Sequence, residues 1–193
     1  MSDKKGYHIG YIGLRLVQQA IASWPDESWE GWHRYSGERG EKLVSKPSAD
    51  LPAEIYACLW ATEQIVSRPH STYLSSSFID HGLYAAGMHW IKPGGCLPRH
   101  LDAERHPDYP WRRTHSIVCF LDAMQDGGEL VLNDGQQIIQ PEAGQVVLFQ
   151  TQDNWHWVNE TKQHRRTLAL FAYQPATGEE HWRQRDRALF RQV

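Results

Sequence analysis

Residues 116–150 read SIVCFLDAMQDGGELVLNDGQQIIQPEAGQVVLFQ, and this stretch decides the class of fold. Short runs rich in Val, Ile, Leu and Phe alternate in it with the turn-forming triplets Asp-Gly-Gly, Asn-Asp-Gly and Glu-Ala-Gly. The pattern predicts strands at Ser116–Leu121, Glu129–Leu132, Gln137–Gln140 and Gln145–Gln150. Many short strands joined by tight turns are typical of a β-sandwich or jelly roll.

Two further strands flank this stretch, Tyr84–Ile91 on its N-terminal side and Arg165–Tyr173 on its C-terminal side. The sequence upstream has a helical pattern, because apolar residues recur at helical spacing from Leu14 to Ile21 and again from Leu51 to Ile65. The segment between these two helices, Trp29–Ser45, is rich in Gly and in charged residues, and we interpret it as a loop.

Helices followed by many short strands predict one domain of mainly β structure with supporting α-helices. We expect a double-stranded β-helix, or jelly roll, with the N-terminal helices packed on one of its faces. The chain then divides into mainly helical support (residues 1–82), the β-helix core (83–174) and a C-terminal tail that we expect to be helical (175–193).

The composition of the 193 residues argues against several classes of protein. A net charge of −3 gives no global field that attracts nucleic acid or an anionic membrane. The three cysteines, Cys58, Cys96 and Cys119, lie far apart, which argues against a disulfide framework and against a thiolate zinc site. No apolar run is long enough for a signal-peptide core or a membrane span, so we expect a cytoplasmic protein.

A histidine and an aspartate two residues apart can supply neighbouring metal ligands, because alternate residues of a strand point the same way. The chain contains two such pairs, His100 with Asp102 and His106 with Asp108. We favour the first pair, which follows a predicted strand and a Pro-Gly-Gly turn. Prolines beside Asp108 exclude regular strand pairing around the second pair.

The third ligand of such a site comes from a distant strand, and His156 and His164 are the candidates. We favour His156, because Trp155 and Trp157 on either side of it would shield a metal site from bulk water. Two histidines and one carboxylate on a single face of an octahedron form the triad that binds Fe(II) and leaves positions open for other ligands.

From about Leu83 to Gln174 the chain resembles the prolyl-hydroxylase-like branch of the Fe(II)/2-oxoglutarate dioxygenases. The matching pieces stand in the order of that family. They are His100-Leu101-Asp102, Phe120-Leu121-Asp122, Gly127-Gly128-Glu129-Leu130, Pro141-Glu142-Ala143-Gly144 with Val146-Val147-Leu148-Phe149, His156-Trp157-Val158 and Arg165-Arg166-Thr167-Leu168. The combination covers nearly half of the chain and is far more specific than any one piece.

The resemblance implies that His100, Asp102 and His156 bind Fe(II), with 2-oxoglutarate and O2 as co-substrates. Arg165 would bind the distal carboxylate of 2-oxoglutarate through its planar fork, a task that suits a guanidinium. Thr167, on the same face of its strand, would add a hydroxyl contact. The apolar wall of the co-substrate pocket would consist of Leu130, Val158 and Phe171.

Two positions depart from the family. Trp90 stands where many relatives place a tyrosine near the co-substrate, and Phe120 lacks a hydroxyl that some relatives use. Arg166 is a second candidate for the anchor if the register of its strand differs by one residue. With Arg165 as the anchor, its neighbour His164 must face the other side of the strand, which favours the other histidine candidate.

The implied activity couples oxidative decarboxylation of 2-oxoglutarate to hydroxylation of a protein side chain or small molecule. A peptide, an amino acid and a small metabolite are all open as substrates, and the loop Ala103–Arg112 is expected to help choose among them. Asp102 favours hydroxylation, since halogenating relatives give up this carboxylate. Two alternatives stay open: a non-enzymatic cupin-like module that binds a small ligand, and an oxygenase acting on nucleic acid bases, which the charge balance argues against.

Overall fold

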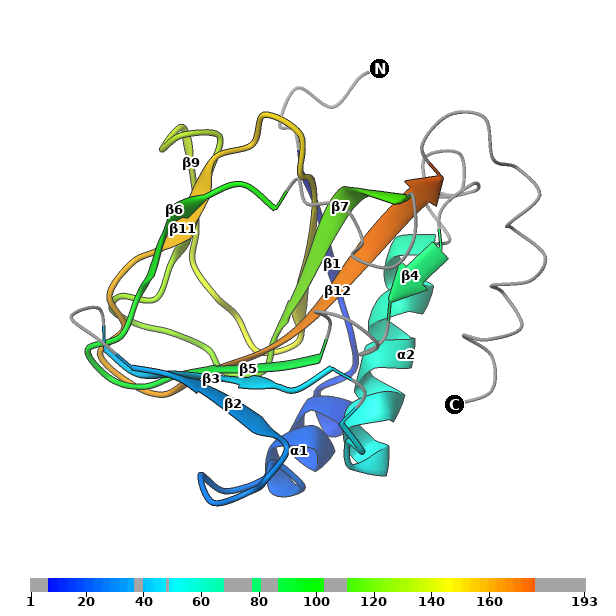
Figure 1. The fold of residues 1–193 in the computed structure, drawn as a ribbon, viewed down its shortest axis with the longest axis vertical. Helices are drawn as coiled ribbons and strands as arrows, with labels where there is room; N and C mark the ends of the chain where they lie inside the picture. Colours follow the sequence, from blue (N-terminus) through cyan, green and yellow to red (C-terminus); the bar gives the residue numbers. More distant parts are fainter. Residues whose placement is uncertain are drawn as a thin grey trace.

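The computed structural model describes residues 7–36, 40–47, 49–67, 78–80, 87–102 and 111–175, and Figure 1 shows the fold. The elements within these ranges are β1 (Tyr7–Tyr11), α1 (Leu14–Ala22), β2 (Trp32–Tyr35), β3 (Lys42–Ser45), α2 (Ala53–Ser67), β4 (Phe78–Asp80), β5 (Gly87–Ile91), β6 (Leu97–His100), β7 (Trp111–Phe120), β8 (Leu130–Leu132), β9 (Gln137–Ile139), β10 (Gln145–Gln150), β11 (His156–Val158) and β12 (Arg165–Pro175). Neither helix is long and apolar enough to cross a bilayer, a finding that covers the described ranges only.

The strands form two sheets in which every pair is antiparallel. The large sheet has the order β1-β10-β7-β12-β5-β3-β2, with β4 also pairing with β12, and the small sheet has the order β6-β11-β8-β9. Figure 1 shows α1 and α2 on the side of the large sheet that faces away from β6, β9 and β11. The predicted jelly roll with helices on one face is confirmed.

One face of the large sheet packs on the helices. Side chains of a strand alternate between its two faces, so Leu168 and Leu170 of β12 point toward α1 and α2. The α2 residues Ile55 and Leu59 recur at helical spacing and meet them from the other side. The buried core on this side also contains Leu43, Met88, Ile117, Cys119, Val146 and Leu148 from the sheet, and Val17 and Ala20 from α1.

The opposite face of the large sheet looks toward the small sheet. A second core fills part of the space between them, built from Ile91, Phe120, Val147 and Phe149 of the large sheet and from Leu130, Leu132, Ile139 and Val158 of the small one. The rest of that space is a pocket. The same alternation that builds the helix-facing core therefore also selects which side chains reach the pocket.

The predicted strands and helices are present with small shifts at their ends. The strand at Gln145–Gln150 has the predicted bounds, and the one expected at Ser116–Leu121 begins earlier, at Trp111. The described part of the expected strand Tyr84–Ile91 is Gly87–Ile91.

The interpretation of Trp29–Ser45 as a loop is wrong, because the segment contains β2 and β3. Three of the four residues of β2 are exposed, so the strand lacks an alternating apolar pattern. Its neighbour β3 is held in the sheet by β5, with Lys42 opposite Ile91. Strands of this kind depend on a partner that is distant in sequence rather than on local propensity.

Residues 1–82 contain more β structure than the expected helical support, since β1 and β4 also lie there. β1 pairs with β10, and β4 pairs with β12, so both extend the large sheet. The expected tail helix falls on residues 176–193, outside the described residues, as does most of the expected loop Ala103–Arg112; Trp111 and Arg112 belong to β7.

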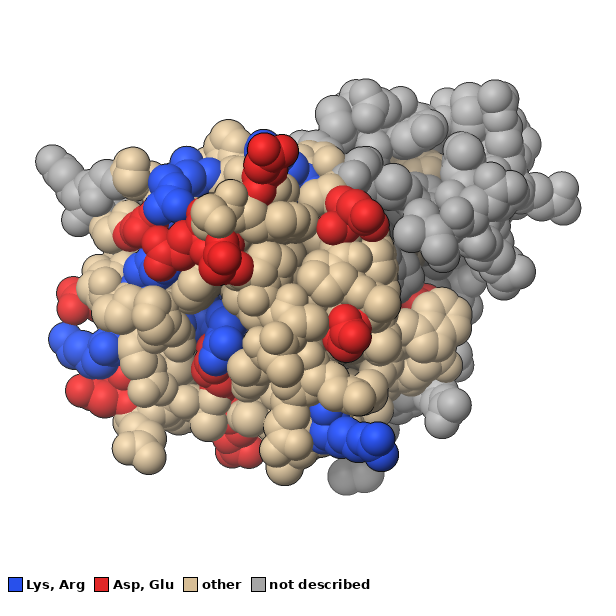
Figure 2. Space-filling model, turned by 90° about the horizontal axis from the view of Figure 1, so that it is seen from below, with Lys and Arg blue, Asp and Glu red and all other residues tan. Residues whose placement is uncertain are grey.

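Charged side chains of both signs are mixed on the face of the molecule shown in Figure 2. On the part of this face that the structure describes, Lys and Arg do not gather into a continuous stripe.

We expect Leu170→Ala to lower the free energy of unfolding by about 2–5 kcal/mol, because the side chain is completely buried between β12 and the helices and its loss leaves a cavity. Urea unfolding followed by circular dichroism measures the change. Ile138→Ala is the control, since Ile138 is 66% exposed and its truncation should change the free energy by no more than about 0.5 kcal/mol. Equal effects of the two substitutions would contradict the assignment of the helix-facing core.

Candidate metal site and adjoining pocket

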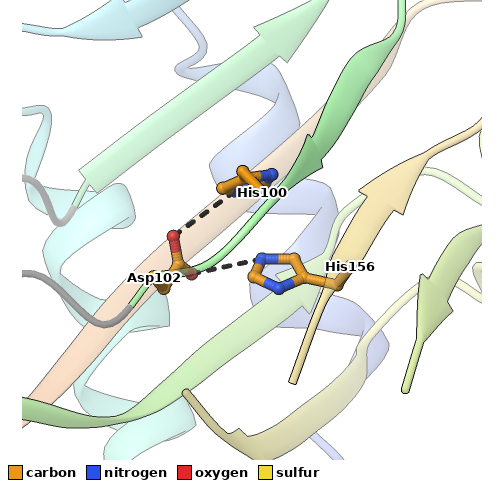
Figure 3. Close-up of side chains that lie close together, drawn as sticks. All are labelled: His100, Asp102 and His156. Atoms are coloured by element: carbon orange, nitrogen blue, oxygen red, sulfur yellow. Dashed lines mark ion pairs between the residues drawn. The ribbon is translucent and has the colours of Figure 1, made fainter. Parts of the chain in front are cut away.

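His100, Asp102 and His156 converge at one point between the sheets. His100 ends β6 and His156 begins β11, and the two residues are cross-strand partners in the small sheet. Asp102 follows His100 by two residues, just beyond the end of β6. Figure 3 shows the three side chains directed toward one another. One ligand atom from each lies within 4.8 Å of the others, and this is the one such cluster among the described residues.

The distances in this cluster suit a metal ion. The Nε2 atom of His100 lies 3.4 Å from Asp102 Oδ1, and the Nε2 atom of His156 lies 3.4 Å from Asp102 Oδ2. Ligands about 2.1 Å from a metal on one face of an octahedron lie about 3 Å from one another. The two distances from the histidines to Asp102 are thus close to those of a metal site, and all three donors lie within 4.8 Å of one another.

Both imidazoles are oriented for coordination by the backbone. His100 Nδ1 lies 2.8 Å from the carbonyl oxygen of Pro98, and His156 Nδ1 lies 2.9 Å from that of Asn154. A carbonyl oxygen only accepts hydrogen bonds, so each Nδ1–H donates, which leaves Nε2 of each ring directed at Asp102 as the atom that would bind a metal. Metal-ligating histidines generally have this second hydrogen bond. The donor set thus fits Fe(II).

Asp102 is held by two further residues of the large sheet. Ser116 Oγ donates a hydrogen bond of 2.7 Å to Oδ2, and Arg113 Nη1 lies 3.5 Å from Oδ1. Burial alone would raise the pKa of Asp102, but hydrogen bonds from His100 and His156, and the charges of His156 and Arg113, hold it well below the usual range. The carboxylate is therefore ionised and ready to act as a ligand.

The other candidate ligands lie elsewhere. His164 accepts a hydrogen bond of 3.1 Å at Nδ1 from Trp90 Nε1, and the two rings are in contact. It is not part of the cluster at His100, although the sequence allowed it as the third ligand. The alternative pair His106 and Asp108 falls outside the described residues.

A pocket of about 860 Å³ opens beside the cluster. Its floor is the inner face of the large sheet, with Arg165, Thr167 and Phe171 of β12 among its lining residues. Leu130 and Val158 of the small sheet line it as well, so the structure brings together five of the side chains that the resemblance assigned to co-substrate binding.

Trp90 and Phe120 do not line this pocket. Trp90 lies on the helix-facing side of β5, packed near Trp32 at a ring distance of 6.1 Å. His89, one residue earlier and opposite Thr167, takes the pocket-facing position instead. Phe120 is completely buried in the core between the sheets, with its ring 5.1 Å from Arg165 Cζ. The placement of Trp90 at the co-substrate is thus corrected by the strand register.

Arg165 enters the pocket and Arg166 does not. Arg165 is 4% exposed, and its Nε donates a hydrogen bond of 2.9 Å to the carbonyl oxygen of Gly128. Burial lowers its pKa to about 10, partly opposed by the charge of Asp122, so the guanidinium is charged at neutral pH. Arg166 is paired with Asp122 through two hydrogen bonds of 3.0 and 2.6 Å.

Many of the pocket residues were not assigned to the site from the sequence. The polar ones among them include Lys42, His89, Arg113 and Ser116. The alternation within the predicted strand Ser116–Leu121 places Ser116 on the same face as Phe120, and this signal was available. Lys42 had no such signal, because its strand was interpreted as a loop.

Comparison with known proteins bears on this arrangement. The model of the family described as the 2OG-Fe(II) oxygenase superfamily matches residues 86–173. No curated protein matches the chain in sequence.

Three solved structures illustrate the likeness in fold. One is a Pseudomonas putida prolyl-4-hydroxylase, with a TM-score of 0.69 and 19% identity, covering 90% of this chain and 95% of that one. The second is a viral collagen prolyl hydroxylase from Paramecium bursaria Chlorella virus-1 in its complex with 2OG (TM-score 0.65, 16% identity, 89% and 98% covered). The third is a Trichoplax adhaerens prolyl hydroxylase in complex with a peptide of the hypoxia inducible factor oxygen degradation domain (TM-score 0.60, 16% identity, 96% and 87% covered). At these identities the structures establish the fold, and the family match covers the strands that carry the metal-site cluster and Arg165.

We expect His156→Ala to weaken Fe(II) binding at least about 100-fold, since the loss of a direct ligand exceeds the 10–100-fold typical of supporting groups. His164→Ala is the matched control and should bind Fe(II) like the wild type. The His164 imidazole is hydrogen-bonded to Trp90 and is not part of the cluster. Anaerobic equilibrium dialysis with Fe(II) measures both. The reverse order of the two effects would exclude the cluster as the metal site.

We expect Gly128→Ala to weaken 2-oxoglutarate binding by displacing Arg165. Gly128 has a φ of 71°, and a Cβ there would lie 2.8 Å from Met124 Cε and 3.3 Å from Arg165 Cδ. Gly94→Ala is the control, since Gly94 has a φ of 81° but its added Cβ would meet nothing within 4 Å. Both variants should lose about 1 kcal/mol of stability or more through backbone strain, and only Gly128→Ala should lose affinity for 2-oxoglutarate in a binding titration.

Proposed function

We propose that this chain, whose residues 86–173 form a 2OG-Fe(II) oxygenase domain, is a hydroxylase that couples oxidation of 2-oxoglutarate to hydroxylation of a second substrate. One oxygen atom of O2 ends in succinate and the other in the hydroxyl group, with release of carbon dioxide. A single observation carries the proposal: one pocket has a two-histidine, one-carboxylate cluster and a buried, charged arginine among its walls.

The cluster would hold Fe(II) through Nε2 of His100, Nε2 of His156 and the carboxylate of Asp102. Fe(II), when bound in such a triad, supplies the activation of O2 that hydroxylation requires. The protein's part is to keep the three donors in place. Ser116 and Arg113 do so for Asp102, and the carbonyl oxygens of Pro98 and Asn154 do so for the imidazoles.

Arg165 would bind the distal carboxylate of 2-oxoglutarate. Its Nε donates a hydrogen bond to the carbonyl oxygen of Gly128, and this bond fixes the direction of the side chain. Its two terminal nitrogens make no hydrogen bond or ion pair with any described residue, so they are available to a carboxylate in the bidentate geometry that a guanidinium favours. Thr167, on the same face and 3% exposed, adds a hydroxyl group beside it.

Apolar side chains would limit the access of water to the co-substrate. Leu130, Val158 and Phe171 line the pocket and are each buried. An environment of low polarity strengthens the charge-assisted hydrogen bonds of Arg165. The retained carboxylate of Asp102 supports hydroxylation as the outcome.

The second substrate is proposed to be a peptide or protein side chain. Support comes from the structural neighbours, which are prolyl hydroxylases, one of them in complex with a peptide. A free amino acid or small metabolite is the alternative outcome of a substrate screen. We further propose a cytoplasmic location, supported by three free cysteines, of which Cys58 and Cys119 are buried.

The proposed function predicts a complex of Fe(II), 2-oxoglutarate and protein. Anaerobic addition of Fe(II) and then 2-oxoglutarate should produce the weak visible absorption band of a chelated 2-oxo acid. Arg165→Ala should raise the concentration of 2-oxoglutarate for half-saturation about 10–100-fold, because charge-assisted hydrogen bonds contribute about 1.5–3 kcal/mol. Arg99→Ala is the matched control, since Arg99 is exposed and paired with Asp134. Iron binding without any band in the wild type would favour the cupin-like binding module instead.

A further inference from the structure

Besides Arg165 and Arg113, the pocket has a further cation, which comes from a strand outside the family match. Lys42 lies on β3, and its side chain lines the pocket beside Arg165 and Thr167. In the large sheet Lys42 is opposite Ile91, and Ile91 is in turn opposite Arg165. Residues in one such row point to the same face of an antiparallel sheet, so both cations project over Ile91 into the pocket.

The two cations are close enough to share one anion. Neighbouring strands are about 4.8 Å apart, which puts the Cα atoms of Lys42 and Arg165 roughly 10 Å apart, with Ile91 between them. Both side chains are long enough to close most of this separation above Ile91. A carboxylate placed over Ile91 would therefore lie within reach of both.

Neither cation has an anionic partner within the described part of the chain. Lys42 Nζ makes no hydrogen bond or ion pair there, and the terminal nitrogens of Arg165 likewise have none. Asp102 is the one carboxylate among the described lining residues, and it is engaged by Ser116 and Arg113. Burial and the charge of Arg165 lower the pKa of Lys42 to about 8, partly opposed by the charge of Asp102, so most Lys42 side chains are still protonated at neutral pH.

Lys42 lines the same pocket as the metal-site cluster, and its charge acts on both Asp102 and His100. A 2-oxoglutarate molecule that reaches the metal site with its oxo-acid end therefore has its distal carboxylate within the space that Lys42 and Arg165 line.

We infer that Lys42 and Arg165 together bind the distal carboxylate of 2-oxoglutarate, an inference that rests on the proposed function. Lys42 is then a specificity-determining residue. It selects 2-oxo acids that carry a second carboxylate, and it supplies a charge that the family-matching segment alone does not contain. Two uncompensated cations in one pocket also oppose folding, so the empty pocket is less stable than a neutral version of it.

The test combines a change in the protein with a change in the ligand. Full-length wild type, Lys42→Met and Lys42→Arg are loaded with Fe(II) without oxygen. Each is titrated with 2-oxoglutarate and with 2-oxopentanoate, which has a methyl group in place of the distal carboxylate. Lys42→Met should weaken 2-oxoglutarate binding about tenfold and leave 2-oxopentanoate binding unchanged, while Lys42→Arg should stay within about threefold of the wild type for both ligands.

Thermal unfolding of the metal-free, ligand-free proteins supplies an independent readout. Lys42→Met should unfold at the same temperature as the wild type or a few degrees above it, because it removes an unpaired cation. A lower unfolding temperature, together with equal losses of affinity for both ligands, would mean a structural role and overturn the inference. Lys42→Gln, which is also neutral, serves if Lys42→Met does not fold.

Unchanged affinity of Lys42→Met for 2-oxoglutarate would overturn the inference. Lys42 would then be assigned to binding an acidic group of the second substrate. Failure of the proposed function has a different signature. In that case the wild type binds neither 2-oxoglutarate nor 2-oxopentanoate, whatever residue stands at position 42.

Discussion

The alternation of side chains along β12 is the constraint on which the rest of this structure depends. Arg165, Thr167 and Phe171 face the pocket, while Leu168 and Leu170 face the helices. β12 pairs with both β5 and β7, so its register is transmitted to the strands on either side. A shift of one residue would exchange the two faces and bury polar pocket residues against α2, at a large cost in free energy.

The metal-site cluster shows how a polar site is kept within an apolar sandwich. It is built on the short strands β6 and β11 of the small sheet, while Ser116 and Arg113 reach it from β7 of the large sheet. Asp102 thus ties the two sheets together. In this partly buried site the polar atoms of the cluster have partners, which offsets the desolvation of a carboxylate and two imidazoles.

The cations of the pocket serve ligand binding but lower the stability of the empty protein. Arg165 and Lys42 point into one space without forming an ion pair with any described carboxylate, and burial lowers the pKa of both. Such an arrangement is costly in an empty protein and favourable once a dianionic ligand is present. Apolar side chains buried in the two cores on either side of the large sheet stabilise the fold against this cost.

The sequence by itself determined the jelly-roll class, most of the strands after residue 83 and the residue types of the site, because strand period, turns and His-x-Asp spacing are local patterns. The short strands β6 and β11, which carry His100 and His156, were not among the predicted strands. Only the tertiary structure decided that His89 rather than Trp90 reaches the pocket and that Arg165 rather than Arg166 does, since facing depends on register with distant strands. It also decided the role of Lys42. That residue lies in a segment without strand-like patterning, which becomes a strand because β5 offers it hydrogen-bonding partners that no local sequence reveals.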